Sequence, residues 1–475
     1  MNTSIARLFT IVIVLFGALI VWTSRWTVFE SNALQSQPLN ELPFFASLKV
    51  KRGRILADDG AVLAKSVPAR GGLWNRKYPL GPLFAQAIGY SILTKHQQAG
   101  LEEYRAKELG GTLRTGLSSV FGPISTQTIG DDVFTTLDQR AQRLAKTELA
   151  GRVGSVVAIV PQTGAVRVMY SNPTYDNNDP FAPCSDSCQF NRATQALYPP
   201  GSTFKVVTSA AALNSGAYTP DSIINGDSPL TVSGVPLSND GGQSWGPITL
   251  RTALTNSVNT VFAQVGLRLG RQTMQTYMKR FGFYSTPPLD YPSNQMSTSG
   301  NWLGGKLVPV TSDQVDLGRM SIGQAKLLVT PLQMAMVAAA VANHGRLMKP
   351  RLATKVVNHV GQVVERVSPQ TYSQVMKPST ATELTRMMTD VVEEGTGQAA
   401  RLGGVQIAGK TGTASTGGFS GGQPLDDAWF IGFAPVQDPK IAVAVTLENI
   451  PNGYGGVYAA PIAAQEIKTL LAEKR

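Results

Sequence analysis

A long hydrophobic run lies near the N-terminus of this chain. Residues 8–22 read LFTIVIVLFGALIVW, with Arg7 before the run and Arg25 after it. A membrane-spanning helix needs about 17–25 residues, so this run lies near the lower limit. A signal peptide carries a similar run but ends in a small-x-small cleavage site, whereas bulky residues close this one. The pattern predicts an uncleaved anchor over residues 1–26, with Arg7 on the cytoplasmic side and the rest of the chain outside.

Strand-like segments enclose a series of helical ones in the C-terminal two thirds of the chain. Residues 155–171 form two apolar runs about a Pro-Gln-Thr-Gly turn, and residues 428–436 and 440–449 form a matching pair. Such an order predicts an α+β domain over residues 136–475, whose sheet unites strands from both ends. Helical spacing of apolar residues predicts the intervening helices over 203–214, 249–269, 330–345 and 379–394.

The segment between anchor and main domain shows shorter elements. RGRILADDGAVLA, residues 52–64, has two apolar runs around an Asp-Asp-Gly turn and predicts a hairpin. GLEEYRAKELGG, residues 100–111, predicts a short polar helix that ends at paired glycines. These signals indicate a separate, β-rich domain over residues 27–135.

Composition narrows the classes of protein. The 475 residues suffice for two or three domains, and 43% hydrophobic with 15% charged residues excludes a largely disordered chain. The net charge of +11 comes from basic residues that are scattered along the chain. No basic run or face indicates nucleic-acid binding, and a surface near anionic lipid or an anionic cell-envelope polymer accounts for the charge.

The chain has two cysteines, Cys184 and Cys188, in the sequence PCSDSCQ. Outside the cytoplasm a local disulfide between them is plausible, although so short a loop limits its stabilising effect. Two free thiols remain the alternative. No further cysteine or HExxH element accompanies them, so a zinc site is not expected.

The first candidate for chemistry is LYPPGSTFKVVT, where Ser202 begins a predicted helix and Lys205 follows three residues later. At this spacing the two side chains share one helix face. A serine hydroxyl becomes a nucleophile when a base takes its proton, and a lysine can be that base if burial or a nearby cation lowers its pKa. Taken alone, Ser202 could equally be a helix cap with a solvated neighbour.

Two other segments carry compatible groups. In TNSVNT, Ser257 and Asn259 suit a turn that directs a hydroxyl and an amide the same way. SGN at residues 299–301 has the same spacing but lies in a stretch, 284–306, that reads as loop. In AGKTGTAS the predicted strand presents Lys410 as a cation and Thr411 and Thr413 as hydroxyl donors. Gly412 leaves room for close backbone approach.

Other serine chemistries fit less well. The three histidines, His96, His344 and His359, stand in no recognisable catalytic setting, so a Ser-His-Asp hydrolase lacks its base. GFSGG around Ser420 matches GxSxG, but we expect it to be a mobile glycine-rich loop beside the site, without the strand-to-helix elbow.

Together, SxxK, SxN and KTG occur in the order found in penicillin-binding proteins and class A β-lactamases. The chain resembles a class B penicillin-binding protein over nearly all of residues 136–475, through segments such as LRTALTNSVNTVFAQVGLRLG and DDAWFIGFAP. The likeness is looser in the N-terminal part, where Ala57-Asp58 replaces the family's usual Asp-Arg pair. It implies an antiparallel sheet flanked by helices, with a helical subdomain, on a small β-rich pedestal.

The resemblance also implies roles for the candidate residues. Ser202 would attack the D-Ala-D-Ala carbonyl of a peptidoglycan stem peptide with Lys205 as base and Ser257 as proton relay, and an amine from a neighbouring stem would complete the cross-link. The same residues would react with penicillin and other β-lactams, without a metal or organic cofactor. The implied binding residues are Asn259, Lys410, Thr411, Gly412 and Thr413.

Further expectations concern partners and alternatives. The resemblance implies attachment to the cytoplasmic membrane and a polytopic glycosyltransferase partner of the SEDS family. The nearest alternatives are a D,D-carboxypeptidase, in which water replaces the amine, and a β-lactamase. A β-lactam sensor or a catalytically idle scaffold of a wall-building complex belongs to a different class, and the intact motif set argues against the scaffold.

Overall fold

A computed structural model of the chain describes residues 3–26, 30, 48–111, 129–184 and 187–472. Its first helix, α1, runs over Thr3–Ser24 with a mean hydropathy of 2.5 and no buried side chain. Among the described residues it is the one helix that is long and apolar enough to cross a membrane. This helix coincides with the predicted anchor.

A five-stranded antiparallel sheet forms the centre of the main domain. Its strand order is β20-β21-β22-β7-β8, so the first two strands of the domain pair with the last three. The prediction of an α+β fold with a sheet uniting both ends is confirmed. The strands are β7 Gly154–Ile159, β8 Val166–Asn172, β20 Ala408–Ser420, β21 Gln423–Ala434 and β22 Ile441–Pro451.

Helices cover both faces of this sheet. Along β21, Trp429 and Ile431 enter one core with helix α13, whereas Phe430 enters a second core with helices α8 and α15. Alternate residues of a strand face opposite sides, so a strand that is buried on both sides is apolar almost throughout. The covering helices are α8 Gln139–Leu149, α13 Pro331–Ala342 and α15 Gly455–Leu471.

Several predicted helices are present, and one predicted loop is not. Helices α9 Lys205–Asn214 and α14 Pro378–Glu393, with α13, confirm three of the predicted stretches. The stretch 284–306 was expected to be a loop, but it contains β13 Gly300–Leu303 and the start of β14 Lys306–Val308. These two short strands form a hairpin about Gly304 and Gly305, and β13 also pairs with the more distant strand β15, Leu327–Leu328.

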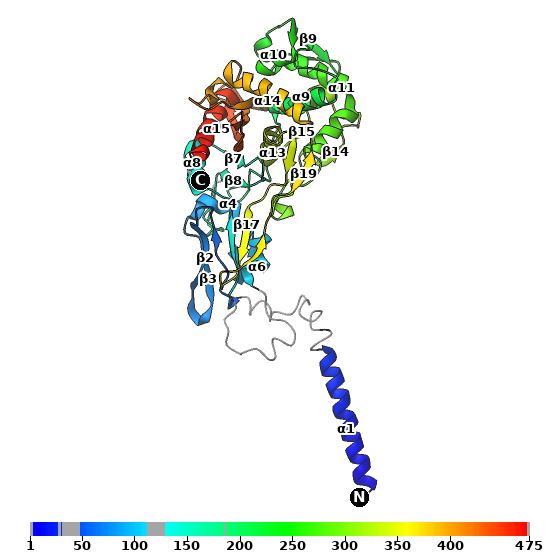
Figure 1. Ribbon diagram of the computed structural model, residues 1–475, viewed down its shortest axis with the longest axis vertical. Coiled ribbons are helices and arrows are strands. Elements are labelled where there is room, and N and C mark those ends of the chain that lie inside the picture. The colour runs from blue at the N-terminus through cyan, green and yellow to red at the C-terminus, as the bar shows by residue number, and fades with distance from the viewer. Residues whose placement is uncertain (1–2, 27–29, 31–47, 112–128, 185–186, 473–475) are drawn as a thin grey trace.

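The pedestal sheet has six strands in the order β18-β17-β6-β1-β2-β3. The predicted hairpin over residues 52–64 is present as β1 and β2. The outer strands β17 and β18 come from far later in the chain, so the sheet draws on both sides of the predicted boundary near residue 136. In Figure 1 this sheet lies at one end of the globular part, and the helices α10 and α11 lie at the other. The strands are β1 Ile55–Leu56, β2 Val62–Pro68, β3 Trp74–Lys77, β6 Asp132–Thr135, β17 Ala353–Val357 and β18 Val363–Arg366.

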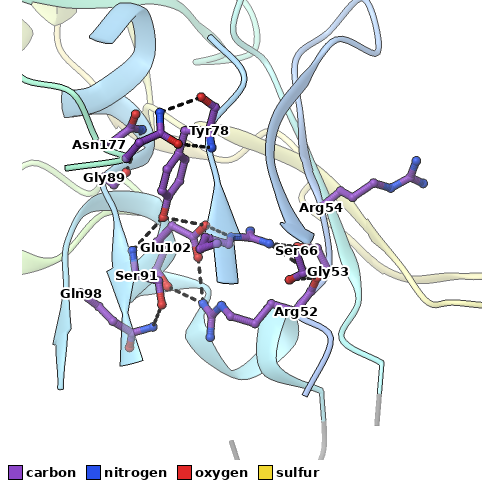
Figure 2. Close-up of polar contacts among 12 residues, drawn as sticks. Arg52, Gly53, Arg54, Ser66, Tyr78, Gly89, Ser91, Gln98, Glu102 and Asn177 are labelled. Atoms are coloured by element: carbon purple, nitrogen blue, oxygen red, sulfur yellow. Dashed lines mark hydrogen bonds and ion pairs between the residues drawn. The ribbon is translucent and has the colours of Figure 1, made fainter. Parts of the chain in front are cut away.

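A buried carboxylate connects the N-terminal segments of the pedestal. The predicted helix 100–111 is two short helices, α5 Gly100–Tyr104 and α6 Ala106–Gly110, and Glu102 of α5 is fully buried. Its carboxylate accepts from Arg52 Nη2 at 2.9 Å and from Arg76 Nε at 2.5 Å. Figure 2 shows Arg52 and Glu102 pointing toward each other. Burial acts to raise the pKa of Glu102, but the two arginines outweigh it and lower the pKa.

Glu102→Gln is therefore expected to destabilise the pedestal by about 3–5 kcal/mol, because it leaves two buried guanidinium groups without their counter-charge. The midpoint of thermal unfolding of the full chain in detergent should fall. In the wild type, the stability that ionised Glu102 contributes should be lost as pH falls through its lowered folded-state pKa. Glu365→Gln is the control: Glu365 of β18 pairs with Arg105, between α5 and α6, but the Glu365 side chain is 41% exposed, so this substitution should cost less than about 1 kcal/mol. Equal effects of the two substitutions would contradict this account.

Cys184 and Cys188 form a disulfide, with their Cα atoms 6.2 Å apart. Cys188 is buried and packs against Ala85 and Tyr175. The backbone oxygen of Cys188 also accepts from Gln86 Nε2 at 3.0 Å. Packing of Cys188 and the Gln86 hydrogen bond therefore attach this loop of the main domain to helix α4, Ala85–Ile88.

Candidate active site

Ser202 lies in a 3₁₀ turn, Gly201–Phe204, that leads directly into α9 at Lys205. The α-helix therefore begins two residues later than the predicted stretch 203–214, and the Ser202 side chain caps no helical N–H. The turn is held by glycines: Gly201 has φ of +51°, and a Cβ there would lie 2.5 Å from the oxygen of Thr413. A Cβ on Gly323 would lie 1.9 Å from the oxygen of Gly201. Glycine at both positions allows Ser202 to approach β20 closely.

The predicted helix 249–269 is interrupted, and the interruption places Ser257. Helix α10, Leu250–Thr255, ends before it, and α11, Asn259–Arg280, begins after it. Ser257 itself has φ of +59°, a left-handed conformation that a continuous helix does not contain. The prediction of one helix was wrong, because helical spacing of apolar residues continues across the break.

Ser257 Oγ accepts hydrogen bonds from two lysines. Lys205 Nζ lies 3.2 Å from it and Lys410 Nζ lies 2.9 Å from it. Lys205 Nζ also donates to the backbone oxygen of Ser257 at 2.6 Å and to Asn259 Oδ1 at 2.7 Å. Asn259 Nδ2 donates to the oxygen of Ser238 at 3.1 Å. The structure thus joins one residue or more from each of the three motifs in a single network.

The KTG segment lies on β20, at the edge of the central sheet. Lys410 is buried, and its Nζ donates to the Thr411 oxygen at 3.0 Å. The Thr411 hydroxyl lies 2.6 Å from that of Thr396, and Thr413 Oγ1 accepts from Gly455 N at 3.4 Å. A Cβ on Gly412 would lie 2.9 Å from the oxygen of Pro200, so glycine lets the strand lie against the serine turn.

Burial depresses the pKa of both lysines, and for Lys205 the nearby charge of Lys410 adds to the effect. The pKa of Lys205 lies well below its usual value, first because the side chain is buried and then because Lys410 is near, while Asp240 acts in the opposite sense. Burial lowers the pKa of Lys410 to about 7. A neutral lysine can accept a proton from a nearby hydroxyl, so the network contains a base.

A cavity of about 700 Å³ opens above this network and is lined by Ser202, Ser257 and Asn259. The two lysines do not line it and lie behind its wall. Sequence reasoning missed residues from several further segments, of which only two give a local signal of close backbone approach: the paired glycines Gly455 and Gly456, and Gly-Thr-Gly at 395–397. The missed lining residues include Asn239, Asp240, Asn256, Gln324, Thr396, Gln398, Asp426, Tyr454, Gly455, Gly456 and Val457.

Two other sequence candidates lie elsewhere. Ser420 was expected in a mobile loop, but it is the last residue of β20, in a hairpin that turns at Gly421 and Gly422 into β21. Hydrogen bonding to β21 continues β20 through this segment, although its glycine-rich composition does not favour a strand. None of the three histidines lines the cavity.

Comparison with known proteins agrees with this architecture. Residues 154–468 match the family model of the penicillin-binding protein transpeptidase domain, and residues 52–126 match that of the penicillin-binding protein A dimerisation domain. The peptidoglycan D,D-transpeptidase PbpA of Mycolicibacterium smegmatis is 34% identical over 502 residues, covering 100% of each chain.

Two solved structures are similar to this chain. The ceftriaxone acyl-enzyme complex of penicillin-binding protein A from M. tuberculosis has a TM-score of 0.79 at 31% identity, covering 90% of this chain and 100% of that one. The D,D-transpeptidase domain of a peptidoglycan glycosyltransferase from Eggerthella lenta has a TM-score of 0.77 at 32% identity, covering 89% and 98%. The chain belongs to the penicillin-binding protein transpeptidase family.

Proposed function

We propose that this chain is a peptidoglycan D,D-transpeptidase with Ser202 as its nucleophile, and that penicillin and other β-lactams acylate the same residue. The observation that carries the proposal is the buried pair Lys205 and Lys410, which share Ser257 Oγ beside the cavity that Ser202 lines. Family membership and the acyl-enzyme complexes of similar proteins support the same chemistry.

Acylation begins when neutral Lys205 takes the proton of Ser202 Oγ. The oxygen then attacks the carbonyl of the penultimate D-Ala, and the C–N bond to the terminal D-Ala breaks. Ser257, which accepts from both lysines, relays the proton to the leaving amine. Lys205 begins the helix that directly follows the turn of Ser202, and its contact with Ser257 Oγ supports the relay.

Substrate binding uses the KTG strand. Thr411 and Thr413, which line the cavity, hold the terminal carboxylate with their hydroxyls, and the Lys410 ammonium attracts it from behind the wall. The backbone N–H groups of Ser202 and Thr413 form the oxyanion hole, which the close approach of the serine turn to β20 supports. Asn259 exchanges the Nδ2 contact with Ser238 for a substrate carbonyl.

A cross-linking assay tests this proposal. The full chain in detergent is given glycan strands with D-Ala-D-Ala stems, and the products are separated by mass. We expect cross-linked dimers together with released D-Ala. Release of D-Ala without dimers would instead indicate a D,D-carboxypeptidase, and rapid turnover of penicillin would indicate a β-lactamase. Neither product would indicate a catalytically idle scaffold.

The rate of acylation by penicillin should have a bell-shaped dependence on pH. It should fall as pH decreases through the lowered pKa of Lys205, because the base becomes protonated. It should also fall as pH rises above about 7, because Lys410 loses the charge that holds the carboxylate. Fluorescent penicillin gives the second-order rate constant at each pH. Lys410→Arg, which remains charged, should remove the alkaline limb, and an unchanged limb in that variant would contradict the assignment.

We also propose how the chain is placed in the cell. Helix α1 serves as a single-pass anchor, with Arg7 on the cytoplasmic side and the main domain outside. Residues 27–135 act as a pedestal for the transpeptidase domain, 136–475, and a SEDS-family glycosyltransferase supplies the glycan, as the family resemblance implies. Membrane-impermeant labelling of a cysteine introduced before Arg7 should fail in intact cells, and labelling there would reverse the orientation.

A further inference from the structure

Asp426 is a buried carboxylate without a partner in the wall of the cavity. It lies on β21 directly opposite Ser415 of β20, and it is 9% exposed. Among the described residues no hydrogen-bond donor and no cation contacts its carboxylate. Buried carboxylates are normally paired or hydrogen-bonded, because an ion loses its hydration on burial. The remaining surface of Asp426 faces the cavity, which also contains Ser202.

The neighbouring residue Asp427 is a carboxylate with a hydrogen-bond partner in the fold. Asp427 is also buried, but its Oδ1 accepts from the backbone N–H of Asn449 at 3.1 Å. Burial raises the pKa of Asp427 to about 7. Asp427 therefore has a hydrogen-bond partner within the fold, whereas Asp426 lines the cavity and has none.

The electrostatic character of this wall favours a cation. Asp240, from the 3₁₀ turn Asp240–Gly242, lines the same cavity. The pKa of Tyr454 is raised first by the charge of Asp240, then by burial and by the charge of Asp426, so all three groups lie near one another. None of the described residues that line the cavity is a lysine or arginine, although the chain carries a net charge of +11. Two acidic groups thus face the cavity, while Lys205, the cation near Asp240, stays buried behind the wall.

We propose that Asp426, together with Asp240, forms the acceptor subsite of the enzyme and binds the side-chain ammonium group of a second stem peptide. The inference rests on the proposed transpeptidase function, which requires an amine to attack the Ser202 ester. The donor's terminal carboxylate leaves with D-Ala on acylation, so the acidic wall of the acyl-enzyme is open to a ligand of positive charge.

The subsite raises the local concentration of the amine and takes no part in the bonds that change. The ammonium group first loses one proton to solvent. The neutral nitrogen then attacks the acyl carbonyl, a C–N bond forms and the ester C–O bond to Ser202 breaks. The second proton of the nitrogen passes to Ser202 Oγ, which restores the free hydroxyl.

Partition of one acyl-enzyme between two acceptors tests the proposal. The full chain in detergent is acylated by a thioester analogue of the donor peptide. It is then offered Nα-acetyl-lysine amide, whose only charge is an ammonium group, or hydroxylamine, which is uncharged at neutral pH. The ratio of aminolysis to hydrolysis is measured, because both reactions start from the same acyl-enzyme and the ratio does not depend on the rate of acylation.

Asp426→Asn should lower this ratio by about tenfold or more for the lysine derivative, and by less than about twofold for hydroxylamine. Asp426→Glu, which keeps the charge, should retain a preference for the lysine derivative, and high salt should weaken the preference in the wild type. Asp313→Asn is the matched control, because Asp313 is fully exposed and does not line the cavity.

An unchanged ratio in Asp426→Asn, or an equal loss for both acceptors, would overturn the subsite. Penicillin labelling of the same preparations separates other causes: a wild type that takes no label would refute the proposed function itself. If Asp426→Asn takes no label, Asp240→Asn is used in the same assay. An unchanged ratio, or an equal loss for both acceptors, would then overturn the proposal.

Discussion

Ser202→Ala is expected to abolish the covalent adduct of this chain with penicillin. The adduct is an ester of Ser202 Oγ, and alanine offers no atom to form it. The substitution removes one oxygen from a half-buried side chain in a turn held by Gly201 and its contact with Gly323, so the fold should persist. Intact-mass spectrometry after penicillin, followed by peptide mapping, should find a single adduct on Ser202 in the wild type and none in the variant.

Ser420→Ala is the matched control for this experiment. Ser420 occupies a GxSxG segment, and the structure places it at the exposed end of a hairpin. This variant should label at the wild-type rate. An adduct that survives in Ser202→Ala but disappears in Ser420→Ala would refute the nucleophile assignment. Full complementation of a deletion strain by Ser202→Ala would show that catalysis is not the essential role.

Lys205→Gln is expected to lower the rate of acylation by about 10²–10⁴-fold, the usual contribution of a general base. The amide of glutamine can still donate hydrogen bonds to Ser257 and Asn259, the acceptors of Lys205 in the wild type. It cannot take the proton of Ser202. Thermal stability should therefore change little while the second-order rate constant with fluorescent penicillin collapses.

Lys205→Arg distinguishes a base from a structural cation at this position. Arginine keeps the charge and the donors but does not lose its proton in proteins. If Lys205 serves as the base, Lys205→Arg should be as slow as Lys205→Gln. Recovery of the rate by arginine would show that the position requires a positive charge rather than a proton acceptor.

Local patterns predicted the elements whose neighbours in sequence are also their neighbours in space. The two hairpins of the central sheet follow from apolar runs about short turns, and α13 and α14 follow from helical spacing. The pair Ser202 and Lys205 also belongs here, because a spacing of three residues places both on one face in a 3₁₀ turn as in an α-helix.

Contacts between distant segments were not predictable in the same way. The break at Ser257 has no glycine or proline to announce it, and the left-handed residue is supported by the lysine contacts that it makes possible. Strands β17 and β18 join the pedestal sheet although they follow α13 in the chain. Asp426 was visible in DDAWFIGFAP, but nothing local distinguishes its free carboxylate from the hydrogen-bonded one of Asp427.

The sequence by itself determined the set of reactive groups, their order and the α+β class, because these depend on residue types and on short-range spacing. Only the tertiary structure decided that Lys205 and Lys410 meet at one serine hydroxyl behind the cavity wall. The lowered pKa of both lysines depends on burial, and that of Lys205 also on its distance from Lys410; both are properties of the packed chain. The same packing leaves the Asp426 carboxylate facing the space where the second substrate is expected.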